Sequence, residues 1–593
     1  IGSCTTREEI SNALYEECGD DIQFAGEDSD QEEEDHLSED DVQSDEEEVC
    51  NESIISESVN VSTTLVNEIT DASPPGSPEV PAVASLPRQD TRIIIPSKRV
   101  LKGKNKHCWT TSKGERRSRT SAINIVRSAR GPTRMCRNIV DPKLCFDLFI
   151  TAEIIDEIVK WTNHEISNKR RENMTSATFS DTCVQEIRAL LGVLVFTAAM
   201  KDNHLSSEEL FDTSSSGSKY VAAMSRDRFD FLIRCLRMDD KTLRPALRQE
   251  DPFIPIRKVW ELFITQCRIN YTPGEYLTID EQLLGFRGRC PFRMYIPNKP
   301  NKYGIKIPMM CDVSSNYMID AIPYIGKATK TNGLPQGEFY VKELSRSVHG
   351  SNRNITCDNW FTSVPLAKSL LLQPYNLTLL GTIRSNKREI PEEIKNTRSR
   401  PVGTSMFCYD GPLTLVSYKP KPSKMVFLLS SCDEPGLINA SSGKPEMVMF
   451  YNKTKGGVDS FDQMCSSMSC SRKTNRWPMA MFYGMLNMAF VNSYPLNRRE
   501  FMKKLNTQLT EPWMNSRLLI PTLKRSARAA IEATLPKLAR NEAEDREGEP
   551  EPKKRRYCDL CTSKKRRMSK MTCTKCKKCI CGEHKKDVCV DCI

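Results

Sequence analysis

Apolar residues recur three and four positions apart through much of the stretch 140–265, and this period predicts packed helices. The clearest segments are LCFDLFITAEIIDEIVKWTNHEI (144–166) and VQEIRALLGVLVFTAAM (184–200). The longest apolar run, Ala189 to Met200, lies in the second segment. It is too short to cross a bilayer, so we expect a buried helix there and no membrane segment in the chain.

Beyond about residue 275 the pattern changes to short extended apolar runs, interrupted by one helical segment, SVPLAKSLLL (363–372). The runs are EYLTID (275–280), GIKIPMMCDV (304–313), YMIDAIPYIG (317–326), RNITCD (353–358) and NLTLLGTI (376–383). This order is typical of an α/β domain, in which catalytic side chains are commonly displayed at strand ends. Two of the runs end in an acid, Asp280 and Asp358.

A third acidic position follows in KGGVDSFDQM (455–464), where the two glycines interrupt any preceding element. Asp459 and Asp462 are three residues apart at the start of a predicted helix, so they face the same direction. Magnesium prefers carboxylate oxygens, and two ions about 4 Å apart can serve phosphodiester chemistry. On spacing alone this signal is weak, because solvent-facing acids and helix caps give the same pattern.

Charge divides the chain. The net charge is +9, but residues 1–87 contain one basic residue, Arg7, and 25 acidic ones, so residues 88–593 carry +33. Such a surplus is expected of a nucleic-acid binder, with a merely soluble basic surface as the alternative. The stretch Glu27 to Glu48, with fourteen carboxylates, predicts a disordered acidic tail.

The acidic tail contains candidate phosphorylation sites, and two basic clusters lie elsewhere in the chain. In the tail, Ser29, Ser38 and Ser44 each precede an acid by three residues, a pattern that acidophilic kinases favour. Our hypothesis is that the tail competes with DNA for the basic surface and that phosphorylation strengthens this competition; a solubilising tail is the alternative. The basic stretch KRVLKGKNKHCW (98–109) predicts a flexible arm. Lys553, Lys554, Arg555 and Arg556 predict a nuclear import signal or phosphate contacts, with solvated surface charge as the alternative.

Eight metal-ligand side chains crowd into residues 558–593 as four spaced pairs. They are Cys558/Cys561, Cys573/Cys576, Cys581/His584 and Cys589/Cys592. A two-residue gap lets one turn present both members to the same ion, so the segment predicts two structural zinc ions that supply its folding energy. The sequence does not fix how the pairs combine, and Cys579 is interpreted as a spare. The other sixteen cysteines are scattered singly, which suits a reducing, intracellular compartment.

Several long blocks resemble the piggyBac transposases, and the resemblance covers most of the chain. They are LTIDEQLLGFRGRCPFRMYIPNKPNKYGIKI (277–307), NITCDNWFTSVPLAKSLL (354–371), GTIRSNKREIP (381–391), RPVGTSMFCYDGPLTLVSYKPKPSKMVFLLSS (400–431) and NKTKGGVDSFDQMCSSMSCSRKTNRWPMA (452–480). The resemblance implies a multidomain α+β protein: an RNase H-like α/β catalytic domain interrupted by an all-β insertion, a helical dimerisation and DNA-binding domain, a C-terminal cross-brace zinc domain and the disordered acidic N-terminus.

The resemblance also implies domain boundaries. We expect an acidic tail and basic arm (1–115), a helical domain in two segments (116–275 and 469–540), a catalytic domain in two segments (276–384 and 446–468), a β-rich insertion (385–445), a basic linker (541–556) and a zinc domain (557–593). Within the insertion, the alternating runs SMFCYDGPLTLVSY (405–418) and KMVFLL (424–429) independently predict a β-hairpin.

By the same resemblance, the family's catalytic aspartates fall on Asp280, Asp358 and Asp459, which would hold two Mg²⁺ or Mn²⁺ ions, with Asp462 as a further required acid. Arg384, Lys387 and Arg388, at the entrance of the insertion, are candidate phosphate contacts, with surface charge as the alternative. Trp477 is a candidate for stacking on an extruded base, or a core tryptophan. In the zinc domain, Cys558, Cys561, Cys581 and His584 would hold one Zn²⁺ and the other four paired cysteines the second.

The implied activity is cut-and-paste DNA transposition. Water nicks the transposon end, the freed 3′ hydroxyl attacks the opposite strand to form a hairpin, and the reopened ends attack a new TTAA target. The expected partners are double-stranded DNA, namely terminal repeats and TTAA target, a second copy of the chain and an acidophilic kinase, and the expected location is the nucleus. The alternative is a domesticated DNA-binding or chromatin protein without mobility.

Three departures limit the resemblance. The chain begins with Ile1, which suggests a reconstructed or truncated reading frame. The segment FVNSYPLNRREF (490–501) is shorter than in the family pattern, and Cys579 takes a position that is not a ligand there.

Overall fold

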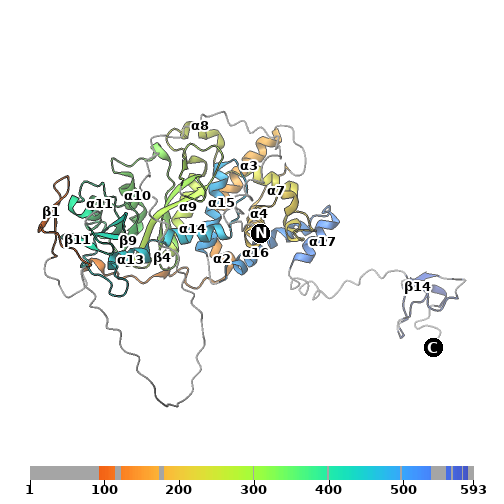
Figure 1. Ribbon diagram of the computed structural model, residues 1–593. Helices are drawn as coiled ribbons and strands as arrows, with labels where there is room; N and C mark the ends of the chain where they lie inside the picture. Colours follow the sequence, from red (N-terminus) through yellow and green to blue (C-terminus); the bar gives the residue numbers. More distant parts are fainter. Residues whose placement is uncertain are drawn as a thin grey trace, which may run out of the picture. The chain divides into compact units, whose positions relative to one another are not determined.

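The fold is described from a computed structural model (Figure 1). The structure describes residues 92–113, 122–171, 179–297, 299–396, 400–493, 497–535, 556–562, 565, 567–569, 571–573, 575–576 and 578–584. The chain forms two compact units, Ile1–Leu210 with Met224–Trp513, and Phe211–Ala223 with Met514–Ile593. The acidic tail with its three serines, Lys553 to Arg555, Cys589 and Cys592 lie outside the described residues.

Helices from both ends of the first unit pack together. Their bounds are α2 (Pro142–Asp147), α3 (Ala152–Arg171), α4 (Val184–Met200), α5 (Ser207–Leu210), α7 (Arg226–Cys235), α8 (Arg244–Leu247), α9 (Ile254–Asn270), α15 (Trp477–Asn492) and α16 (Arg498–Leu518). The predicted buried helix is confirmed, since α4 is apolar on all sides and its residues 189–199 are buried. Asn506 of α16 donates to the Gly192 carbonyl of α4 at 2.9 Å.

Buried ion pairs join these helices. Arg228 of α7 contacts Glu186 of α4 at 2.6 Å, and Arg237 contacts Glu165 of α3 at 2.8 Å. All four side chains are at most 10% exposed, so loss of one partner would leave a buried charge without its counter-ion. In the described part of the chain, no helix has the length and apolarity that a membrane crossing requires.

An eleven-stranded mixed sheet forms the other half of the first unit. Its strands are β1 (Val100–Lys102), β2 (Cys108–Thr110), β5 (Tyr276–Gly285), β6 (Arg293–Tyr295), β7 (Tyr303–Asp312), β8 (Met318–Ala321), β9 (Asn354–Cys357), β10 (Thr378–Thr382), β11 (Ser405–Asp410), β12 (Leu413–Lys421) and β13 (Lys424–Ser430). The order is β1-β2-β11-β12-β13-β10-β9-β5-β7-β6, with β8 beside β7. Strands β5, β9 and β10 are mutually parallel, and β7 runs antiparallel to β5. All five predicted runs are confirmed as strands.

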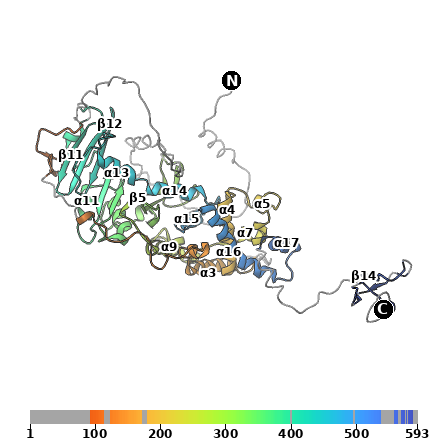
Figure 2. The same ribbon diagram turned by 90° about the horizontal axis from the view of Figure 1, so that it is seen from below.

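The predicted β-hairpin at 405–429 is confirmed by β11, β12 and β13, and it extends the sheet beyond β10 (Figure 2). Its inner face includes Phe407, Val416 and Leu428, which pack with Met447 and Tyr451 of α13 (Glu446–Thr454). Around the sheet lie the short helices α10 (Gln336–Leu344), α11 (Val364–Leu370) and α12 (Glu392–Lys395). Helix α14 (Gly457–Ser467) follows α13.

The prediction of a flexible basic arm at 98–109 is wrong. This stretch forms the β1–β2 hairpin, and β2 pairs with β11 through Thr110 and Tyr409. Trp109 is fully buried and donates from Nε1 to the Glu389 carbonyl at 2.8 Å. The lysines and glycine made the arm look mobile, but its pairing partners lie about 300 residues further along the chain.

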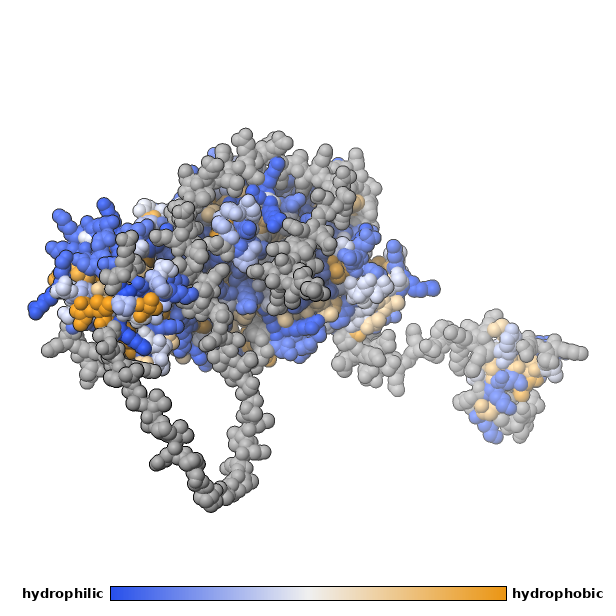
Figure 3. Space-filling view, in the orientation of Figure 1, coloured by the Kyte–Doolittle hydropathy of each residue, from blue (hydrophilic) through white to orange (hydrophobic). Residues whose placement is uncertain are grey.

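The second unit contains a small helical core. Ala222 of α6 (Lys219–Ala223), Met514 of α16 and Ile531 of α17 (Arg525–Thr534) are buried together. A separate short segment carries β14 (Arg556–Tyr557), β15 (Met568–Ser569) and a 3₁₀ turn at Gly582–His584. The described part of the visible face is largely hydrophilic, with smaller hydrophobic patches (Figure 3).

Candidate functional site

Asp280 and Asp358 lie on neighbouring parallel strands. The register of β5 and β9 pairs Ile279 with Cys357, so the two aspartates follow one matched pair. Ligand oxygens of Asp280, Asp358 and a third acid, Glu281, all lie within 4.8 Å of one another. The prediction that Asp280 ends its strand is wrong, because β5 continues to Gly285. The aspartate instead follows the last residue of β5 that pairs with β9.

Glu281 was not predicted as a site residue, because adjacent residues of a strand normally point to opposite faces. Here the Asp280 carboxylate accepts the Glu281 N–H at 2.8 Å, and one oxygen of each carboxyl group lies within 4.8 Å of the other. The signal that identifies Glu281 is therefore three-dimensional.

Helix α14 carries the remaining predicted acids and packs against β5. Asp459 lies in its first turn, and its charge contributes to raising the pKa of Asp280. One turn later, Asp462 accepts a hydrogen bond from Gln282 Nε2 of β5 at 2.5 Å. The structure thus brings Asp280, Asp358 and Glu281 together, and Gln282 fixes Asp462 to the strand that carries Asp280. Asp459 is not among the residues whose ligand oxygens converge, so its place in the site stays a prediction.

Burial of these acids favours their neutral forms. Desolvation, followed by the charge of Glu281, raises the pKa of Asp358 to about 7. The same causes, with Asp358 as a further neighbour, raise the pKa of Asp280 well above its usual value. Desolvation also raises the pKa of Asp462. Carboxylates crowded in this way favour a bound cation, which would compensate their mutual repulsion.

Two lysines approach the cluster, and neither was singled out from the sequence. Lys299 Nζ lies 3.8 Å from Glu281, and Lys306 Nζ lies 4.0 Å from the same carboxylate. Desolvation opposes the charge of Lys299, but Glu281, Asp280 and the two acids of α14 outweigh it and raise the lysine pKa. Lys306 also lies 4.1 Å from the ring centre of Trp360, so an aromatic face holds this cation beside the acids.

The predicted DNA-contacting residues fall in two places. Arg384 donates from Nε to Asn359 Oδ1 at 3.2 Å, one residue from Asp358, and Lys387 and Arg388 follow in the same loop. Trp477 is 9% exposed and lies against the rings of Phe253 and Phe292, at 5.7 and 5.0 Å between ring centres. This burial favours the core role for Trp477, while base stacking stays a prediction.

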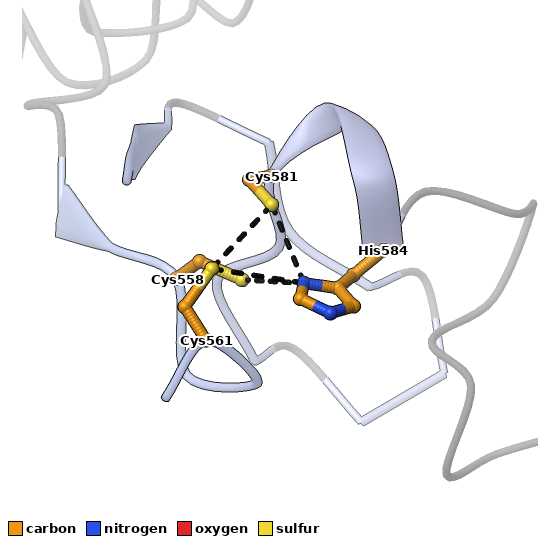
Figure 4. A group of neighbouring side chains, drawn as sticks. All are labelled: Cys558, Cys561, Cys581 and His584. Atoms are coloured by element: carbon orange, nitrogen blue, oxygen red, sulfur yellow. Dashed lines mark hydrogen bonds between the residues drawn. The ribbon is translucent and has the colours of Figure 1, made fainter. Parts of the chain in front are cut away.

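Four side chains of the Cys-rich segment converge (Figure 4). Sγ of Cys558, Cys561 and Cys581 lie 3.5, 3.8 and 3.3 Å from His584 Nδ1, and the sulfurs of Cys561 and Cys581 lie 3.7 Å apart. Tetrahedral bonds of about 2.3 Å to sulfur and 2.0–2.1 Å to nitrogen would place such atoms roughly 3.5–3.8 Å apart. The donors therefore fit one tetrahedral metal ion, and they are the four that the resemblance grouped together.

The electrostatics of this group also suit metal binding. Burial alone would raise the pKa of Cys581, but the N–H groups of His584 and Glu583 and the neighbouring thiols lower it to about 6. Cys573 is buried and Cys576 is exposed, whereas their predicted partners are not described. Cys579 is not among the four converging residues, and its Sγ lies 3.5 Å from the Ser569 carbonyl oxygen.

Comparison with known proteins decides the family. Residues 141–494, more than half of the chain, match the family described as Transposase IS4. A solved structure of a piggyBac transposase synaptic complex with hairpin DNA is 63% identical, with a TM-score of 0.68, over 79% of this chain and 100% of that one. The chain belongs to the piggyBac family of transposases.

Two human relatives match this chain at lower identity. PiggyBac transposable element-derived protein 3 and the chimeric ERCC6-PGBD3 protein, both from Homo sapiens, are each 24% identical over 382 residues, or 60% of this chain. The matched region spans 61% and 34% of these curated relatives. The match to the piggyBac transposase structure covers 79% of this chain, whereas each human relative matches 60% of it.

Proposed function

We propose that the protein is a DNA transposase that excises its element through hairpin ends and inserts it at TTAA targets. The converging carboxylates of Asp280, Asp358 and Glu281 carry this proposal, because they supply the acidic site that phosphodiester cleavage needs. Asp459, in the first turn of α14, is the proposed third catalytic aspartate. The relative of known structure is a transposase in complex with hairpin DNA, which supports the same class of substrate.

The sheet order around the site supports an RNase H-like catalytic domain. Asp280, Asp358 and Asp459 would hold two magnesium or manganese ions, since their oxygens are the hard ligands that these ions prefer. When bound, the ions would activate the attacking oxygen and stabilise the leaving oxygen. The protein supplies the geometry: β5 and β9 fix two carboxylates, and Gln282 holds α14 to β5 through Asp462.

Every step of excision and insertion is an attack on a phosphodiester by water or a 3′ hydroxyl, so one site can serve each step without a covalent protein intermediate. Arg384 is placed to contact a phosphate beside Asp358, since it already bonds the adjacent Asn359. Lys306 stands beside the acids and can balance their charge while DNA enters.

The Cys-rich segment supports a second role, recognition of the transposon ends. Cys558, Cys561, Cys581 and His584 would hold a structural zinc ion, and a second zinc ion at the remaining paired cysteines completes the proposed module.

We further propose that the protein acts in the nucleus and that it acts as a homodimer. A domesticated DNA-binding protein is the alternative, but the complete set of carboxylates favours the enzyme.

The experiment that tests the function is an excision assay on a reporter with the terminal repeats that flank this gene and TTAA on both sides. Asp280→Asn should abolish excision, because the amide loses the charge that metal binding requires, and it should leave binding to terminal-repeat DNA unchanged. Excision by Asp280→Asn at the wild-type rate would refute the proposed site.

A further inference from the structure

Three buried threonines join the segments that carry the proposed catalytic aspartates. Thr278 lies in β5 two residues before Asp280, and Thr356 lies in β9 two residues before Asp358. The parallel register pairs these two threonines directly. The third, Thr454, is the last residue of α13, and the three residues are 0–1% exposed.

Their hydroxyl groups form a connected set of hydrogen bonds. Thr278 Oγ1 donates to the Thr454 carbonyl. Thr356 Oγ1 donates to Thr454 Oγ1 at 2.8 Å, and Thr454 Oγ1 donates in turn to the Phe450 carbonyl at 3.0 Å. Thr454 therefore bonds both aspartate-bearing strands at once, through its backbone on one side and its hydroxyl on the other.

This contact lies directly before α14. Only Lys455 and Gly456 separate Thr454 from the first residue of α14, Gly457, and Asp459 follows in the first turn. The Gly457 backbone passes so close to β5 that an added Cβ would lie 2.9 Å from Thr278 Oγ1. A shift of the end of α13 would therefore move Asp459 relative to the carboxylates of the sheet.

We propose that Thr454 is a positioning residue that sets the distance between Asp459 and the pair Asp280 and Asp358. This inference rests on the proposed function, because it concerns the same carboxylate site. Thr278 and Thr356, each two residues before a strand aspartate, are the residues of the sheet that bind Thr454 and so hold the segment that carries Asp459.

The test compares Thr454→Val with Thr454→Ser and with Thr197→Val. Thr197 is a matched control, since it is fully buried in α4 and its hydroxyl donates to the Leu194 carbonyl at 2.8 Å, away from the acids. Each variant is assayed as full-length, zinc-loaded protein, for the maximal excision rate and for Mn²⁺ affinity by electron paramagnetic resonance. Thermal melting first establishes that each variant is folded at the assay temperature.

Thr454→Val should lower the maximal excision rate by roughly 10-fold to 100-fold, because a misplacement of about 1 Å has an effect of that size. It should weaken Mn²⁺ binding on the order of tenfold, as loss of supporting residues around metal ligands commonly does. Thr454→Ser should restore both values, and Thr197→Val should lower stability without changing Mn²⁺ affinity.

The inference is overturned if Thr454→Val behaves like Thr197→Val, or if Thr454→Ser is as defective as Thr454→Val. Should Thr454→Val not fold, Thr278→Val replaces it; it removes only the bond to the Thr454 carbonyl, and the same loss of rate and affinity is expected. Asp280→Asn is measured in parallel. If it excises normally the proposed function fails, whereas an inactive Asp280→Asn beside a normal Thr454→Val defeats this inference alone.

Discussion

Replacing Gly457 by alanine tests how closely α14 must lie against β5. The added Cβ would lie 2.9 Å from Thr278 Oγ1 and 3.2 Å from Thr278 Cβ, whereas ordinary contacts begin at 3.4 Å. Thr278 cannot easily yield, because it is β-branched, buried and bonded to the Thr454 carbonyl. The start of α14 must therefore move by about 0.5 Å or the Thr278 hydrogen bond must break.

Gly457→Ala is expected to lower both the stability and the activity. Overpacking costs about 1–3 kcal/mol, and the gain in helix propensity returns up to about 1 kcal/mol, so the net loss of unfolding free energy is about 0–3 kcal/mol. A displacement of Asp459 by half an ångström should lower the excision rate on the order of tenfold. Gly456→Ala is the matched control, since an added Cβ there meets nothing within 4 Å and the backbone φ is −86°.

The assay measures excision rate and melting temperature for both variants on the same reporter. Gly457→Ala should be slow yet folded, and Gly456→Ala should be close to the wild type in both. Wild-type excision by Gly457→Ala, or equal losses in the two variants, would show that the close approach of α14 to β5 does not set the geometry of the acids.

Three further predictions concern single side chains. Glu281→Gln should weaken Mn²⁺ binding about tenfold, as measured by titration. Glu338→Gln, which changes a carboxylate paired with Lys342, should leave Mn²⁺ binding unchanged. Equal Mn²⁺ affinities of the two variants would exclude Glu281 from the metal site. In metal-free protein the raised pKa of Asp358 contributes stability at acidic pH that is lost as the pH rises to about 7. Asp358→Asn should therefore flatten this decline in melting temperature with pH, and it should abolish excision. An unchanged pH profile of the melting temperature would contradict the raised pKa of Asp358. Cys581→Ser should release zinc and unfold the Cys-rich segment without changing Mn²⁺ affinity, whereas Cys579→Val should retain the zinc. Elemental analysis and melting curves check both variants. Loss of zinc in Cys579→Val would show that Cys579 is a ligand.

What could be predicted from the sequence was mostly local. The Gly-Gly pair before Asp459 indicated a helix start, and α14 begins at Gly457. The spacing of Cys558/Cys561 and Cys581/His584 identified ligand pairs, and their four donor atoms converge. In both cases the informative residues lie within a few positions of one another, so the chain geometry of a single turn already restricts where the side chains point.

What the sequence did not show depends on pairing between distant segments. The hairpin at residues 100–110 was missed because its partner strand, β11, lies about 300 residues away. Glu281 was missed because its place in the cluster depends on the side-chain orientations of two adjacent residues of β5 and on Asp358 of β9. No period or motif in either stretch records these contacts.

The threonine cluster shows how the two kinds of information combine. The short patterns TID at 278–280 and TCD at 356–358 are visible in the sequence, but they carry no meaning until the parallel register pairs Thr278 with Thr356. In this register the hydroxyl groups of both threonines donate to Thr454, which lies five residues before Asp459 in the chain. A carboxylate site assembled from distant segments needs such a fastening, because metal binding requires its ligands to be held at fixed distances before the ion arrives. The residues that meet this requirement are uncharged and buried, so a search for charged or metal-binding side chains passes over them.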